Sequence, residues 1–181
     1  MPGDLDPLPF TVDPDDQACT AARAAADDAG VARWRAWLQA YLDETLALDD
    51  GELERRPEVL CWLFPIGTRS PVNPDAPVIG RHAIGAAVEA DPLLRDALLR
   101  AFVRMLAFYG IAQATSGLQW VSGQPAWVEH PTHNERRVSR MLHCMHSAGL
   151  RGRAQALMTL LEREFVCEPE RLKWWRHQVA S

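Results

Sequence analysis

The sequence lacks the features that mark membrane, secreted and disulfide-rich proteins. No apolar run approaches the ~18 residues that a membrane-spanning helix needs, and the opening MPGDLDPLPF has neither the basic nor the apolar region of a signal peptide. The cysteines show no CxxC spacing, so we expect reduced and mostly buried thiols; they are Cys19, Cys61, Cys144 and Cys167. From these absences we expect a cytoplasmic protein.

Lysine is almost absent as well, since eighteen arginines stand against a single lysine. Together with abundant alanine, this bias is typical of GC-rich coding and leads us to expect a bacterial source. The formal net charge of −5 argues against strong non-specific binding to nucleic acid. The charge is uneven, because residues 1–58 carry a net −9 and residues 59–181 a net +4. We expect an acidic face or tail followed by a mildly basic remainder.

Apolar residues are plentiful enough for one sizeable core. The chain of 181 residues is 48% hydrophobic and 24% charged, which is typical of a single globular domain. Residues 1–16 hold four prolines and five aspartates, and this composition predicts a disordered acidic arm. We expect residues 17–181 to form a single helical domain.

The apolar spacing predicts an all-α bundle of about seven helices, because a period of i, i+3, i+4, i+7 recurs and no parallel-sheet signal is present. One helix is expected from Glu52 to Phe64. A small hairpin is expected near 118–129, with strands at 119–121 and 127–129. Capping signals predict that helices begin after Asp91 and Thr132. Residues that break or cap helices predict where others end: Gly30, Pro65, Gly110 and Gly149.

The stretch CWLFPIG, Cys61 to Gly67, places bulky apolar side chains where Pro65 must end a helix. We expect Trp62 and Phe64 to lie under the Pro-rich loop that follows. They would form either a packed corner of the core or the wall of a pocket.

Five stretches in order resemble the conserved N-terminal domain of the opioid growth factor receptor family, over about residues 31–166. They are WLFP at 62–65, MLAFYGI at 105–111, HNERRVSRML at 133–142, GL at 149–150 and LLEREF at 160–165. The resemblance implies an all-helical domain. In animals the family is described as a nuclear-associated receptor for an opioid peptide that restrains growth. It therefore implies a receptor-like, non-enzymatic protein-binding module connected with signalling.

A candidate anion site lies on the helix that Thr132 is predicted to open. His133, Arg137 and Arg140 fall at i, i+4 and i+7 on one face. Guanidinium groups near a helix N-terminus suit a carboxylate or phosphate, and Asn134 could orient it. The alternative is that both arginines form ion pairs with Glu135 or with acids of the first part of the chain, and so organise the fold.

The pattern HCMH, His143 to His146, does not place enough ligands together for a zinc site, so we expect no metal and no other cofactor. Three functions stay open. The first is a non-enzymatic binding module with a protein or peptide partner, or a small anionic ligand. The second is a small-molecule-binding protein or enzyme that uses the same arginine face, with Trp62 and Tyr109 as walls. The third, a nucleic-acid-associated protein, is disfavoured by charge. We expect a monomer or a homodimer.

Overall fold

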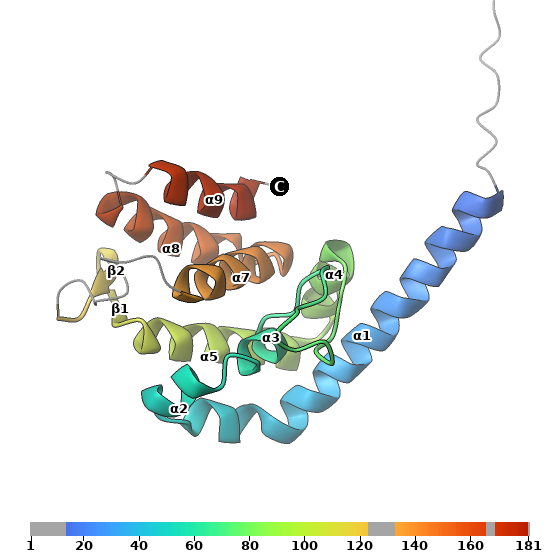
Figure 1. Ribbon diagram of the computed structural model, residues 1–181, viewed down its shortest axis with the longest axis horizontal. Coiled ribbons are helices and arrows are strands. Elements are labelled where there is room, and N and C mark those ends of the chain that lie inside the picture. Colours follow the sequence, from blue (N-terminus) through green and yellow to red (C-terminus); the bar gives the residue numbers. More distant parts are fainter. Residues whose placement is uncertain (1–13, 123–132, 166–168, 181) are drawn as a thin grey trace, which may run out of the picture.

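The computed structural model describes residues 14–122, 133–165 and 169–180, without the side chains of residues 14–18 and 171. The predicted all-α class is confirmed: this part of the chain forms eight helices and one two-stranded hairpin (Figure 1). In chain order the elements are α1 (Pro14–Ala47), α2 (Asp50–Arg55), α3 (Val59–Leu63), α4 (Arg81–Ala90), α5 (Pro92–Phe108), β1 (Ile111–Ala114), β2 (Gly117–Trp120), α7 (His133–Ser147), α8 (Arg151–Glu164) and α9 (Pro169–Ala180). No helix among these residues is long and apolar enough to cross a membrane.

Helix α1 runs without interruption through Gly30, so the predicted helix end at this residue is wrong. Gly30 is buried where α1 crosses the segment before α4, and an added Cβ would lie 2.8 Å from the carbonyl oxygen of Val78. The glycine therefore permits close approach of two backbones rather than a left-handed cap. One turn earlier, Asp27 accepts a hydrogen bond of 2.6 Å from the N–H of Gly80, the N-cap residue of α4.

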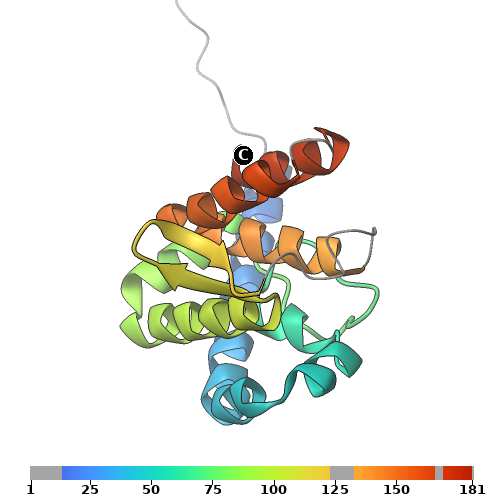
Figure 2. The ribbon, with the colours of Figure 1, turned by 90° about the vertical axis from the view of Figure 1, so that its left-hand side faces the viewer.

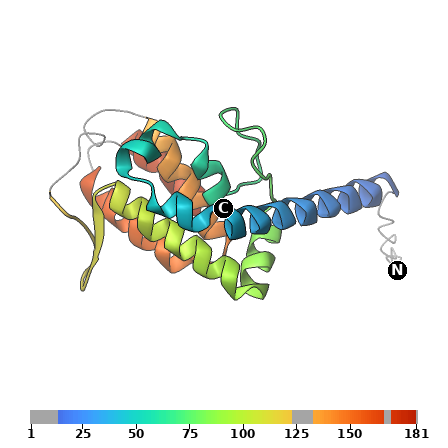
Figure 3. The same cartoon turned by 90° about the horizontal axis from the view of Figure 1, so that it is seen from below.

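The first part of α1 extends beyond the other helices (Figures 1 and 3). Because α1 begins at Pro14, the last three residues of the predicted acidic arm belong to this helix. Pro14 occupies the first helical position, where its missing N–H has no helical partner to lose. The rest of the predicted arm lies outside the described residues.

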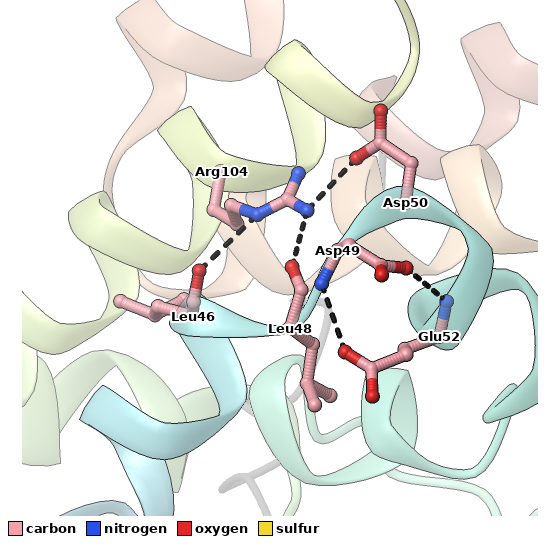
Figure 4. A network of polar contacts seen from close by, with 6 residues as sticks. All are labelled: Leu46, Leu48, Asp49, Asp50, Glu52 and Arg104. Atoms are coloured by element: carbon pink, nitrogen blue, oxygen red, sulfur yellow. Dashed lines mark hydrogen bonds and ion pairs between the residues drawn. The ribbon is translucent and has the colours of Figure 1, made fainter.

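Arg104 of α5 fastens the corner between α1 and α2 (Figure 4). Its Nε donates to the carbonyl of Leu46 at 3.2 Å, and one terminal nitrogen donates to the carbonyl of Leu48 at 2.7 Å and to the Asp50 carboxylate at 2.8 Å. The last carbonyls of a helix have no partner within the helix, so the guanidinium satisfies groups that burial would otherwise leave unpaired. This contact fixes where α2 starts relative to α5.

Two short helices replace the single helix predicted from Glu52 to Phe64. Helix α2 begins with a capping box in which Asp49 and Glu52 each accept a hydrogen bond from the other's backbone N–H. It ends before Pro57, which cannot donate a helical hydrogen bond and disfavours the helical conformation of the residue preceding it. Helix α3 then ends at Leu63, two residues before Pro65, as predicted.

The core lies between α5, α7, α8 and the second part of α1. Asp91 caps the N-terminus of α5 by accepting from two backbone N–H groups. The apolar stripe of α5 is buried and consists of Leu94, Ala97, Leu98, Ala101, Phe102, Met105 and Leu106. Gly110 and Gly149 follow α5 and α7 with φ of 74° and 73°, so the predicted ends of these two helices are confirmed. Helix α7 packs against α4, α8 and α9, and even some of its polar side chains are buried.

The hairpin lies earlier than the sequence predicted. Strands β1 and β2 pair with Ile111 opposite Trp120, so residues 119–120 belong to the second strand and not to the first. Figure 2 shows the hairpin against α5, while β2 also contacts α8. The predicted partner strand at 127–129 lies outside the described residues, as does the predicted cap Thr132.

Gly30→Ala tests the close approach of α1 and the segment before α4. Although alanine is the better helix former, we expect the variant to lose about 1–2 kcal/mol of unfolding free energy, because its methyl group would meet the Val78 carbonyl. Gly152→Ala in α8 is the matched control, since nothing lies within 4 Å of its added Cβ. Urea unfolding of both variants measures these losses. Equal losses of unfolding free energy would contradict the close approach of α1 to the segment before α4.

Candidate functional site

A cleft of about 610 Å³ opens between α7, the α2–α3 segment, the loop after α3 and α9. The sequence places cations on the α7 wall at helical spacing, and this spacing turns them to one face. Apolar side chains form much of the opposite wall; they include Pro57, Leu60, Ile66, Pro71 and Val72. The cleft therefore combines an apolar surface with a positively charged one.

Arg137 lies at the base of the α7 wall and is nearly buried, with a side chain that is 7% exposed. One terminal nitrogen donates to Glu54 Oε2 at 2.6 Å and to Asn134 Oδ1 at 3.1 Å, and the other donates to the Glu54 carbonyl at 3.2 Å. Its guanidinium carbon also lies 5.8 Å from the centroid of the Phe108 ring. Nε is buried and makes no hydrogen bond within the described residues. Arg137 is thus engaged by the fold.

His133 shares the same acid, because its Nε2 contacts the second carboxylate oxygen of Glu54. Glu54 belongs to the acidic first part of the chain. An ion pair between an arginine of α7 and such an acid is what the alternative interpretation of the sequence predicted. Asn134 orients Arg137 and does not line the cleft. Three of the residues predicted from sequence, together with Glu54, therefore form one network, in which Arg137 and Asn134 are buried while His133 is exposed to solvent and Glu54 partly so.

Arg140 has a different environment from Arg137, although both come from the same helix face. It lines the cleft, is partly exposed, and donates one hydrogen bond of 3.1 Å to the carbonyl of Phe64. Within the described residues no carboxylate pairs with it. Arg136, one turn earlier, is exposed, lines the cleft and likewise has no carboxylate partner among them.

Trp62 and Tyr109 do not line the cleft. Trp62 stacks on Trp37 of α1, with ring centroids 5.4 Å apart, and the guanidinium carbon of Arg33 lies over the Trp62 ring, 5.6 Å from its centroid. It therefore belongs to the contact between α1 and α3. Tyr109 is fully buried beside Arg137 and Glu54, and burial raises the pKa of its hydroxyl.

Several lining residues were not among those predicted from the sequence to form the anion site. Arg136 and His143 could have been found, because they lie one turn either side of Arg140 on α7. Thr68 and Ser70 come from the Pro-rich loop, and Trp174 comes from α9. Only the tertiary packing of distant segments brings these three to the cleft.

Several arginines lie around the second half of α7 and influence the histidines there. The pKa of His143 is lowered, first by burial and then by Arg81, Arg140 and His177, against a raising hydrogen bond with Gln178. The pKa of His146 is lowered in the same way. Burial raises the pKa of the Cys144 thiol to about 12, so this cysteine stays protonated and unsuited to nucleophilic attack. Among the described residues no three His, Cys, Asp or Glu side chains gather to hold a metal.

Comparison with known families gives one match. The family model described as the "Opioid growth factor receptor (OGFr) conserved region" matches residues 39–178, a range that includes every residue lining the cleft. No curated protein and no solved structure matches the chain.

Glu54→Gln tests the ion pair that holds the buried Arg137. The change leaves the guanidinium of Arg137 buried without its carboxylate, and we expect a loss of about 2–3 kcal/mol, less than for a fully buried pair because water reaches Glu54. Glu162→Gln is the matched control. Glu162 is 37% exposed against 40% for Glu54, but its partner Arg176 is itself 54% exposed. We expect the control to lose less than about 1 kcal/mol. Similar losses in denaturant unfolding would show that burial of Arg137 has no special role.

His143 should make stability depend on pH. Its pKa in the folded protein lies below the ordinary value of 6.5, so as the pH falls below that value the unfolded chain takes up a proton that the folded chain does not. The unfolding free energy of the wild type should therefore fall more steeply between about pH 7.5 and about pH 5.5 than that of His143→Gln. Parallel slopes in urea unfolding would contradict the lowered pKa.

Proposed function

The chain belongs to the family of the opioid growth factor receptor conserved region, and we propose that it is a non-enzymatic, receptor-like binding module. Its cleft takes a protein, peptide or small ligand through an anionic group carried on an apolar body. Family membership supports the receptor-like part of the proposal. The anion recognition is argued from the cleft alone.

The guanidinium of Arg140 is the observation that carries the proposal. It is partly buried, lines the cleft and donates one hydrogen bond to a backbone carbonyl. A guanidinium has five N–H donors and a permanent charge. Within the described residues nothing negative neutralises it, so an anion entering the cleft gains a charge-assisted hydrogen bond without breaking an ion pair.

The opposite wall supplies the apolar part of the recognition. Leu60, Ile66 and Val72 line it, and Val72 is 60% exposed. Binding that covers such surface is favourable in proportion to the apolar area removed from water. A ligand with only a charge would use Arg140 alone, whereas an amphipathic anion would use both walls.

A small-molecule ligand is the second candidate, and the size of the cleft favours it. A volume of about 610 Å³ lies within the roughly 300–1,000 Å³ that is usual for small-molecule sites. Among the basic residues predicted to bind such a ligand, Arg137 and His133 form ion pairs with Glu54, whereas Arg140 does not. Either ligand would therefore be recognised through Arg140.

Arg140→Ala tests the anion site with anilinonaphthalene sulfonate, a fluorescent amphipathic anion. We expect the wild type to bind the dye with enhanced fluorescence, and the variant to bind it at least about tenfold more weakly, because one charge-assisted interaction is lost. Arg153→Ala is the control: this residue of α8 is exposed and does not line the cleft. Circular dichroism confirms that each variant is folded. Equal dye affinity in both variants would refute the role of Arg140.

A further inference from the structure

We propose that the anionic group recognised by the cleft is a phosphate monoester, held between two arginines of α7 and the hydroxyl groups of the loop opposite. The inference rests on the proposed function, since it names the chemistry of the group that the cleft binds. It is argued from the two walls and from the charges around them.

The α7 wall offers more positive charge than a single carboxylate would balance. Arg136 and Arg140 lie one helical turn apart, and both line the cleft. Among the described residues in the lining, Glu54 is the only carboxylate, and it is already bound by Arg137 and His133. The cleft therefore presents two guanidinium groups that no lining acid neutralises.

The loop wall offers hydroxyl donors. Ser70 is 9% exposed, and its Oγ accepts the backbone N–H of Val72 and the thiol of Cys61, each at 3.3 Å. Both bonds use Oγ as an acceptor, which leaves the hydroxyl proton as a donor. Thr68 adds a second hydroxyl from the same loop. Donors on this side face the cations of α7 across the cleft.

A phosphate monoester matches this arrangement better than a carboxylate does. It carries a charge of about −1.5 to −2 at neutral pH and three acceptor oxygens, so it can contact both guanidinium groups and a hydroxyl at once. A carboxylate has a single charge and two oxygens in one plane. Arg81, whose charge contributes to the lowered pKa of His143, adds a further positive charge near this end of α7.

The rest of the ligand is expected to be apolar. Ile66 and Val72 line the loop side of the cleft, and Trp174 of α9 lines it with a side chain that is 61% exposed. An aryl or alkyl body attached to the phosphate would cover these side chains. Such a monoester could be a phosphorylated side chain of a partner protein or a small phosphorylated molecule.

Displacement of anilinonaphthalene sulfonate by three competitors provides the test: phenyl phosphate, benzoate and inorganic phosphate. With the wild type we expect phenyl phosphate to displace the dye at about tenfold lower concentration than benzoate, and inorganic phosphate to be weaker than phenyl phosphate. Arg136→Gln, an exposed position, should reduce the preference for phenyl phosphate over benzoate several-fold. Arg153→Gln on α8 should leave the preference unchanged.

The outcomes separate the two proposals. If benzoate and phenyl phosphate displace the dye equally while dye binding still depends on Arg140, the phosphate inference is overturned and the proposed function stands. If Arg136→Gln keeps the full preference, the inference is overturned too. If the folded wild type does not bind the dye, both proposals fail.

A last comparison distinguishes the two sources of the monoester. A short peptide with one phosphotyrosine among neutral residues is titrated beside phenyl phosphate, with its unphosphorylated form as the control. Tighter binding of the phosphopeptide than of phenyl phosphate would support a phosphorylated partner protein. Tighter binding of phenyl phosphate would support a small molecule. Measurable binding of both peptides with equal affinity would overturn the inference, because the phosphate would then contribute nothing.

Discussion

The burial of one arginine governs the architecture around the cleft. Arg137 reaches from α7 to Glu54, a residue 83 positions earlier in the chain, and is held there by the carboxylate and by Asn134, with Phe108 beside it. A buried guanidinium is tolerated only where such partners exist. The contact therefore joins the acidic first part of the chain to the basic remainder and fixes α2 against α7. The Arg104 contacts at the end of α1 hold α2 in the position that this pairing requires.

The same ion pair divides one helix face into two roles. Arg137 and Arg140 are three residues apart, and from the sequence they look equivalent. Glu54 lies within reach of Arg137 and His133, and its two carboxylate oxygens are thereby used. Arg140 instead donates to the carbonyl of Phe64, and its remaining N–H donors are left for the cleft. The structural interpretation thus holds for Arg137, whereas Arg140 has no carboxylate partner among the described residues and is the arginine on which the proposed anion recognition rests.

Local signals were enough to predict much of the fold. Asp91 before Pro92 begins α5, and glycines at positive φ follow α5 and α7, because capping depends on a few adjacent residues. The predicted helix end at Gly30 is wrong because no local signal distinguishes a glycine that permits close approach of two backbones from a glycine that caps a helix. The prediction of one helix from Glu52 to Phe64 includes Pro57, because the apolar pattern on either side of this proline is the stronger signal. The α7 cations could be placed on one face from their spacing, but Thr68, Ser70 and Trp174 reach the cleft only through tertiary packing.

The Pro-rich loop after α3 is held in place by contacts of its own, which supports the proposed binding at the cleft. Ile66 and Val78 form a bridge at its two ends, and Ile79 donates to the Ile66 carbonyl. Within the loop, Asn73 donates to the carbonyl of Glu58 and its side-chain oxygen accepts the N–H of Asp75. Four prolines restrict the backbone further. A ligand would therefore meet hydroxyl groups already in place and would lose little affinity to ordering the loop. The aromatic residues before Pro65 serve this end, since Phe64 and Trp62 anchor the loop's start to the core and to α1.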